Sequence, residues 1–367
     1  MIRKYCKEAL SFAAAMMSFW AFADQAAAKA ARRFATGGDV SSFHYTDASG
    51  VGWTAFVHTF TNTAEAAEFK NRSGKTLPVR YLVVGGGGAG MDGLTGTSNL
   101  AAGGGGGGGG GVTETNALLS VGDIWSIRVG VGGGIPNHSQ RSARFASGAS
   151  CVSNGIVEVV LVPGGGAGGS NNVNPTPGAA GGGGAGLSSL SKRQGAKGNY
   201  TSSTFISEGV VEPNGGNGSN AGYGGGGGGA GANGNAAAGG VGLASDITGN
   251  EVVYGSGGGG GGAFRADLAK AINGGSGGTN AGNGGTGVFS EAVVEGNVVT
   301  NLTVSKAEAP VANTGCGGAG GVTYGGSYNH GDIPEGYNYA TAGADGVVII
   351  RYEADLPRPK GFLAIFQ

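Results

Sequence analysis

The feature that most restricts this sequence is glycine that runs without interruption, at its longest over residues 103–111. Glycine has no Cβ, so its backbone loses more conformational entropy on folding than that of other residues, and ordering each residue costs roughly 1–2 kcal/mol. An isolated polyglycine segment also leaves every N–H and C=O group to water. Such a run therefore either packs against other runs and hydrogen-bonds to them, or remains a flexible linker.

Glycine runs recur along the whole chain, in which glycine supplies 86 of 367 residues. Linkers usually contain serine and charge and join separate domains, whereas these runs alternate with apolar segments inside one unit. We expect polyproline II-type helices, which have about three residues per turn and must bundle to satisfy their backbone groups. Flexible loops are the alternative. The runs lie at 85–90, 103–111, 130–134, 164–169, 178–186, 222–234, 255–262, 274–287 and 315–321.

Short segments rich in β-branched and aromatic residues separate the runs and predict strands. These segments lie at 51–60, 79–84, 124–129, 156–162 and 347–352. Two Gly-Asn pairs between β-branched residues, in 246–253 and 293–300, predict hairpins. We therefore predict an all-β fold, in which a small sheet or sandwich framework carries a bundle of polyglycine helices. Little α-helix is expected outside the N-terminal segment.

Composition narrows the class of protein further. The net charge is −1, which gives no electrostatic basis for binding nucleic acid or an anionic membrane. Hydrophobic residues make up 39% of the chain, which argues against ordinary disorder. Proline is scarce, at 10 residues, and glycine keeps no strict third-position period, so collagen is excluded.

The N-terminus has the pattern of an export signal. A basic stretch up to Lys7 precedes an apolar run over 9–23, which ends in the small-residue cleavage site Ala21-Phe22-Ala23. We predict a signal peptide at 1–23, a spacer at 24–50, a glycine-rich domain at 51–352 and a C-terminal arm at 353–367. The mature protein is then extracellular or on the cell surface, without a membrane span. The alternative is an uncleaved amphipathic helix that continues through Arg33.

Cysteine usage fits export but leaves the redox state open. Removal of the signal peptide leaves Cys151 and Cys316. An even pair in an exported chain permits one disulfide, and two isolated thiols are the alternative.

Motifs that resemble catalytic or cofactor sites are best explained by the abundance of glycine. Gly85 to Gly90 matches the G-x-G-x-x-G of dinucleotide-binding folds, but nine glycines follow at 103–111 where that motif needs a helix. The four histidines lack metal-ligand spacing, and no carboxylate pair stands out. We expect no cofactor, no metal and no enzymatic activity.

Two segments near the C-terminus are candidates for recognition. The first is an Asn/Gly-rich loop, whose tyrosines either contact a glycan or protein or cap the glycine bundle. The second is the arm, whose apolar residues either fold back on the chain's own sheet or bind a neighbouring copy. The loop candidates are Tyr324, Tyr328, Tyr337 and Tyr339, and the arm candidates are Phe362, Leu363, Ile365 and Phe366.

Three stretches together resemble a known family. Val57-His-Thr-Phe-Thr61, Tyr81-Leu-Val-Val-Gly-Gly-Gly-Gly88 and Ala344-Asp-Gly-Val-Val-Ile-Ile-Arg-Tyr352 resemble the glycine-rich domain of bacterial secreted proteins and phage tail-tip adhesins. The resemblance implies a β framework with a sandwich of polyglycine helices and variable loops at its tips, which bind host receptors in the phage proteins. It implies no catalytic residues.

The expected function is therefore a non-catalytic, exported structural protein that self-associates into a filament, matrix or surface layer. The export signal departs from the phage pattern and favours a cellular protein. A receptor-binding adhesin is the alternative. Ice binding needs a flat, regular Thr or Ala face, which the irregular spacing of the runs does not support.

Overall fold

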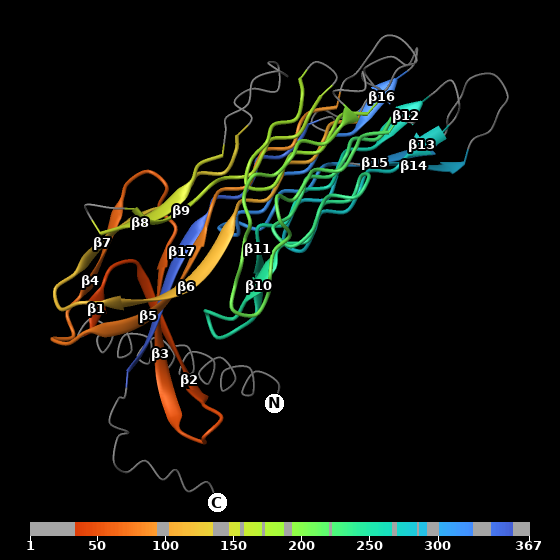
Figure 1. The fold of residues 1–367 in the computed structure, drawn as a ribbon. Coiled ribbons are helices and arrows are strands. Elements are labelled where there is room, and N and C mark those ends of the chain that lie inside the picture. Colours follow the sequence, from red (N-terminus) through yellow and green to blue (C-terminus); the bar gives the residue numbers. More distant parts are fainter. Residues whose placement is uncertain are drawn as a thin grey trace, which may run out of the picture.

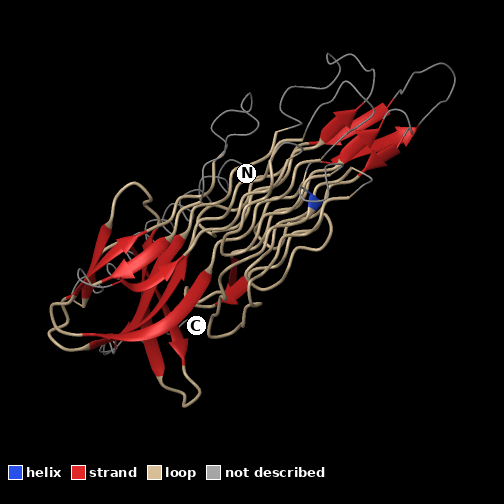
Figure 2. Cartoon of the chain, turned by 45° about the horizontal axis from the view of Figure 1, so that its top comes forward, coloured by secondary structure: helices blue, strands red, loops and turns tan. Residues whose placement is uncertain are grey.

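A computed structural model describes residues 34–93, 103–134, 147–154, 158–170, 173–186, 193–219, 222–265, 270–284, 286–291, 301–325 and 339–354. The secondary-structure elements of these residues are strands, apart from a single helical residue at Arg193, which confirms the all-β prediction. A β-sandwich lies at one end of an elongated molecule, glycine tracts run side by side from it, and smaller sheets lie at the far end (Figures 1 and 2).

Two five-stranded antiparallel sheets make the sandwich. The first has the order β2-β3-β17-β5-β6, with β2 at Asp39–Thr46, β3 at Gly52–Phe60, β17 at Val347–Ala354, β5 at Leu77–Val84 and β6 at Val112–Leu119. The second has the order β1-β4-β7-β8-β9, with β1 at Ala35–Thr36, β4 at Ala67–Asn71, β7 at Ile124–Arg128, β8 at Ser150–Ser153 and β9 at Glu158–Val162.

The core of the sandwich is aromatic and β-branched because alternate residues of each strand point to the same face. Tyr81 on β5 meets Trp125 on β7 edge-on, with ring centroids 5.1 Å apart. His58 and Phe69 meet in the same way across the two sheets, at 5.0 Å. Burial of each such side chain stabilises the fold by about 1.5–3 kcal/mol, so this core anchors the molecule.

The opposite face of the first sheet has its own, smaller core near the glycine tracts. Leu82, Val84 and Ile349 pack there against the hairpin formed by β10 (Leu243–Ser245) and β11 (Val252–Tyr254). The turn lies where the Gly-Asn pair predicts it, and Gly249 adopts a φ of +92°, which favours glycine. This hairpin prediction is confirmed.

The far end of the molecule carries short strands. β12 (Ala263–Arg265) lies between β13 (Lys270–Ile272) and β16 (Thr323–Gly325), and the β12–β16 pair is parallel. β14 (Thr286–Glu291) and β15 (Asn301–Ser305) form an antiparallel pair around the second predicted hairpin, whose turn at 292–300 lies outside the described residues. The glycine tracts separate these strands from the sandwich (Figure 1).

The glycine tracts hydrogen-bond to one another with a period of three residues. Tract 103–111 lies among six other tracts. Its successive N–H groups donate to three of these tracts in turn, with N···O distances of 2.7–3.2 Å. Gly103, Gly106 and Gly109 donate to tract 222–228, Gly104, Gly107 and Gly110 to 315–321, and Gly105, Gly108 and Gly111 to 163–169. The carbonyls of this tract accept bonds in the same rotation, from 180–186, 258–261 and 85–91.

No side chain fits inside this arrangement. A Cβ placed on any residue from Gly103 to Gly110 would lie 1.7–2.2 Å from a carbonyl oxygen of a neighbouring tract. Tracts 224–229 and 257–262 meet neighbours on several sides in the same way. The uninterrupted glycine of these tracts is therefore a packing requirement.

Tracts on the outside of the bundle expose every third residue, and these positions carry polar side chains. Asn273, Ser276 and Thr279 are exposed, whereas the residues between them are partly covered. Several asparagines at such positions accept an amide from the next tract. Asn217 Oδ1, for example, accepts from the N–H of Gly195 at 2.9 Å. Asparagine thus replaces a missing neighbouring tract at the bundle surface.

The five predicted strands all form, but the framework begins earlier than the sequence indicated. The expected spacer at 24–50 contains β1 and β2 in its described part, and β2 pairs with β3 along its whole length. β2 is an edge strand with alternating exposed residues, so its polar composition resembled that of a spacer. β17 extends two residues into the expected arm, to Ala354; the rest of the arm and the expected signal peptide lie outside the described residues.

Candidate functional site: an arginine groove on the open sheet face

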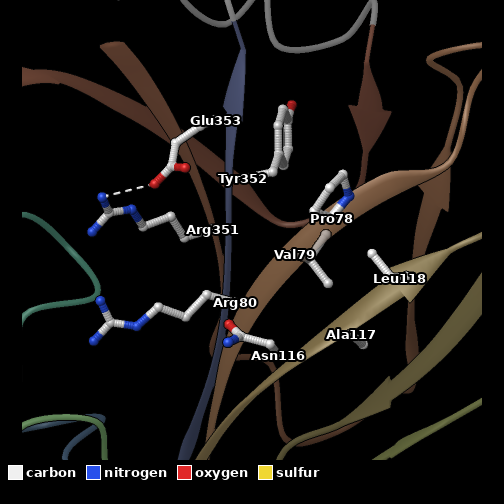
Figure 3. A pocket seen from close by; sticks show the side chains of 9 residues that line it. All are labelled: Pro78, Val79, Arg80, Asn116, Ala117, Leu118, Arg351, Tyr352 and Glu353. Carbon is white, nitrogen blue, oxygen red and sulfur yellow. Dashed lines mark hydrogen bonds and ion pairs between the residues drawn. The ribbon is translucent and has the colours of Figure 1, made fainter. Parts of the chain in front are cut away.

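A groove of about 470 Å³ lies on the face of the first sheet that points away from the main core. The β10–β11 hairpin covers this face only near the glycine tracts. Strands β5, β6 and β17 supply all of its lining. Figure 3 shows Arg351 and Glu353 on one side of β17, with Tyr352 on the other. The lining residues are Pro78, Val79, Arg80, Asn116, Ala117, Leu118, Arg351, Tyr352 and Glu353.

Two arginines define the groove, and strand alternation places them there. Arg80 follows the core residue Val79 on β5, and Arg351 follows the core residue Ile350 on β17. Each therefore points to the face away from the main core. The two arginines are also direct cross-strand partners in the β5–β17 register.

Like charges directly opposite each other destabilise a sheet, so the groove needs carboxylates. Arg80 pairs with Glu114, which is fully buried, and with Asp246 at 2.5 Å, from the turn of the β10–β11 hairpin. Burial alone would lower the pKa of Arg80, but the hydrogen bonds and charges of these two carboxylates raise it. The guanidinium is therefore permanently charged and fixes the hairpin to the sheet.

Arg351 has a different environment. Its Nη2 lies 3.0 Å from Glu353 Oε1, and its guanidinium stacks on the rings of Phe43, at 4.9 Å, and Tyr45, at 5.1 Å. Such cation–π contacts stabilise by about 0.5–2 kcal/mol. The Arg351 residue is only 9% exposed, and its Nε is buried and has no hydrogen-bond partner. Burial and the Glu353 carboxylate raise the pKa of Tyr45.

This arrangement suits binding rather than proton transfer. A guanidinium donates hydrogen bonds but does not release its proton at physiological pH, so neither arginine can serve as a general acid or base. Within the described ranges, no group of three or more His, Cys, Asp or Glu residues could hold a metal ion. The same part of the chain contains no helix long and apolar enough to cross a membrane.

The two cysteines do not form the disulfide that the sequence permitted. Cys151 and Cys316 are both free and buried. Cys151 lies in β8, paired with Arg128 and Leu161 in the sandwich. Cys316 lies in a glycine tract, where burial raises the pKa of its thiol. The alternative of two isolated thiols is the correct one, because the two residues belong to different layers of the molecule.

The other candidates from the sequence do not join the groove. The G-x-G-x-x-G stretch is a bundle tract, in which the amides that would bind a pyrophosphate already donate to neighbouring tracts, as Gly88 does to Gly108 at 2.8 Å. Among the tyrosine candidates, Tyr324 lies in β16 and Tyr339 is half-buried. Tyr328, Tyr337 and the arm residues Phe362, Leu363, Ile365 and Phe366 lie outside the described residues.

Sequence reasoning missed the groove, although one signal was present. Strands β5 and β17 each carry a single arginine between apolar residues, in Val79-Arg80-Tyr81 and Ile350-Arg351-Tyr352. A charge in the middle of an apolar strand needs a partner or a ligand. The partners Glu114 and Asp246 come from distant parts of the chain, and no local pattern connects them.

Comparison with known proteins identifies the type of domain. A family model described as a glycine-rich domain matches residues 61–353, which include β4 to β16 and nearly all of β17. No curated protein matches the chain.

Proposed function

The chain belongs to the glycine-rich domain family, and we propose that it is an exported, non-catalytic structural protein in which polyproline II-type glycine helices form a rigid spacer. The observation that carries this proposal is the rotation of hydrogen bonds around tract 103–111, in which every third amide reaches the same neighbour. A polyproline II helix has about three residues per turn and directs its backbone groups outward, which accounts for this rotation.

Rigidity follows from the number of constraints on each residue. Tract 103–111 donates to three tracts and accepts from three others, so no amide in it depends on water. Local opening would break bonds to several tracts at once, whereas a flexible linker has none to break. A spacer of this kind keeps the sandwich and the far strands at a fixed separation.

Hydrogen exchange tests the spacer. We expect the amides of 103–111 and 224–229 to exchange only on global unfolding, and the amide of Gly74, in the exposed loop between β4 and β5, to exchange rapidly. Rapid exchange throughout both tracts would leave only the linker interpretation.

The structural role in a filament or surface layer is tested by microscopy and truncation. We expect the mature chain, starting near Asp24, to form regular assemblies under negative stain, and deletion of 357–367 to leave folded monomers. Unchanged assemblies after the deletion would rule out the arm as the contact.

N-terminal sequencing of protein from outside the cell tests the cleavage site. Recovery of intact Met1 in that material would contradict cleavage.

A receptor-binding adhesin is the second candidate, and one observation favours it. The bundle carries the β12–β13–β16 and β14–β15 sheets at the end opposite the sandwich (Figure 1). A spacer that ends in small sheets is suited to present a recognition surface away from its base. An adhesin would remain discrete under negative stain, and fluorescently labelled protein would bind to cells or glycans.

A further inference from the structure

The arginine groove has a binding capacity that the spacer role does not use, and the inference below does not depend on that role. Arg351 is nine-tenths buried, and its Nε has no hydrogen-bond partner. A buried donor without an acceptor destabilises a folded protein, so a ligand that supplies an acceptor there gains that free energy. Arg80, by contrast, already pairs with two carboxylates.

Glu353 indicates which acceptor fits. It makes one contact with Arg351, from Oε1 to Nη2 at 3.0 Å, whereas a carboxylate placed along the edge of a guanidinium makes two parallel bonds. The Glu353 side chain is 43% exposed, and its carboxylate also contacts the Tyr45 hydroxyl, so a competing ligand must replace it at both groups. We propose that the groove binds a carboxylate ligand, which displaces Glu353 and bonds to both Nη2 and Nε of Arg351.

The remainder of the groove determines what carries the carboxylate. Leu118 is 71% exposed and lines the groove together with Pro78 and Ala117, while Asn116 offers an amide beside the arginines. The ligand is therefore an acid with an apolar group next to it. The groove volume, about 470 Å³, is in the range of small-ligand sites. A free organic acid and an acidic residue beside an apolar one on a partner protein share this chemistry.

Calorimetric titration of the full chain tests the ligand class. Phenylacetate is expected to bind at least about tenfold more tightly than phenylacetamide, which lacks the charge, and than acetate, which lacks the apolar group. Tighter binding of the capped dipeptide N-acetyl-Phe-Glu-amide than of phenylacetate would identify a partner protein as the source; weaker binding would identify a free acid. Equal binding of phenylacetamide and phenylacetate would overturn the proposal.

Variants at the groove give effects of opposite sign. Arg351→Gln should weaken phenylacetate binding at least about tenfold, whereas Glu353→Gln should tighten it by removing the competing carboxylate. Arg128→Gln, at an exposed arginine on the other sheet, is the control and should change nothing. Unchanged or weaker binding by Glu353→Gln would overturn the displacement of Glu353.

Two substitutions of the surface residue Leu118 keep the test decisive if the Arg351 variant does not fold. Leu118 is exposed, so substitutions there should leave the fold intact. Both variants lose the apolar contact of Leu118, but Leu118→Lys should bind phenylacetate more tightly than Leu118→Glu, because the two place opposite charges at the groove. Identical affinities of these two variants would contradict a carboxylate site.

Discussion

At the scale of single residues, glycine is required in this molecule for two different reasons. In the bundle it is required by space, because a carbonyl of another tract occupies the position of the missing Cβ. In turns it is required by backbone conformation, as at Gly122, where φ is +80° and an added Cβ would have no neighbouring atom within 4 Å. The two reasons predict different costs for the same substitution.

We therefore expect Gly107→Ala to destabilise the protein by about 3 kcal/mol or more, since its Cβ would lie 2.1 Å from the carbonyl oxygen of Gly88. Gly122→Ala is the matched control and should cost about 1–2 kcal/mol, from its left-handed backbone alone. Urea unfolding midpoints measure both. If the tract were an unpacked linker, Gly107→Ala would be neutral or stabilising by up to about 1 kcal/mol, because it reduces the entropy of the unfolded chain.

His58 is a second residue whose burial has a measurable consequence. It is fully buried; its Nδ1 lies 2.5 Å from the carbonyl oxygen of Gly37, which can only accept, so Nδ1 carries the proton. Nε2 of the neutral ring then accepts from the Tyr352 hydroxyl at 3.2 Å. Burial lowers the pKa of His58 below its usual value of 6.5, although the Gly37 contact opposes this.

The direction of this shift predicts acid sensitivity. Between the lowered pKa of folded His58 and 6.5, the unfolded chain binds the proton and the folded protein does not, so stability falls as pH falls through this interval. The free energy of unfolding should therefore decrease from pH 7 toward pH 5, and less steeply in His58→Gln. His44→Gln, at an exposed position on β2, is the matched control substitution. Parallel slopes in all three proteins would contradict this assignment.

At the scale of elements, asparagine side chains complete the hydrogen bonding of outer tracts. Asn217 and Asn214 lie one turn apart on the same tract, and both are exposed. Asn217 accepts the Gly195 amide through its side chain, whereas the backbone N–H of Asn214 donates to Asn233 Oδ1. Only the first side chain links two tracts directly.

Asn217→Ala should therefore cost about 1 kcal/mol, the net value of a typical hydrogen bond. Asn214→Ala removes no such bond and should stay within about 0.5 kcal/mol of the wild type. Thermal unfolding compares the two variants. A larger loss from Asn214→Ala would mean that the asparagines act through solvation and not as substitutes for a neighbouring tract.

At the scale of the whole molecule, the bundle and the sandwich are expected to unfold together. Ordering glycine costs roughly 1–2 kcal/mol per residue, which the net hydrogen bonds of about 1 kcal/mol each do not offset alone. The tracts therefore depend on the sandwich: β5 leads directly into tract 85–91, and tract 103–111 leads directly into β6. The apolar core holds the ends of the tracts in register.

A core variant tests this dependence. Ile350→Ala, at a fully buried position on β17, should cost about 2–5 kcal/mol. Trp125 fluorescence, which reports on the sandwich, and the exchange of amides in 103–111, which reports on the bundle, should lose stability by the same amount. A bundle that retained its protection in this variant would be an independently stable unit.

The sequence by itself determined the class of the fold and half of the ten sandwich strands, namely β3, β5, β7, β9 and β17. Apolar, β-branched segments such as 79–84 and 347–352 have few alternatives to a strand, and uninterrupted glycine excludes helices and side-chain packing. These are local properties, so they can be recognised from the amino-acid sequence alone. Strands β1, β2, β4, β6 and β8 were not predicted; β2, for example, is a polar edge strand that buries little and so lacks an apolar signal.

Only the tertiary structure decided which tracts are neighbours, that the two cysteines stay apart, and that two arginines meet on one sheet face. Arg80 and Arg351 are register partners because β17, near the end of the chain, pairs between β3 and β5. Glycine tracts carry no side chains that could specify a partner, so their order follows from the strands that anchor them. Long-range pairing of this kind depends on the whole folded chain, and no local pattern of residues encodes it.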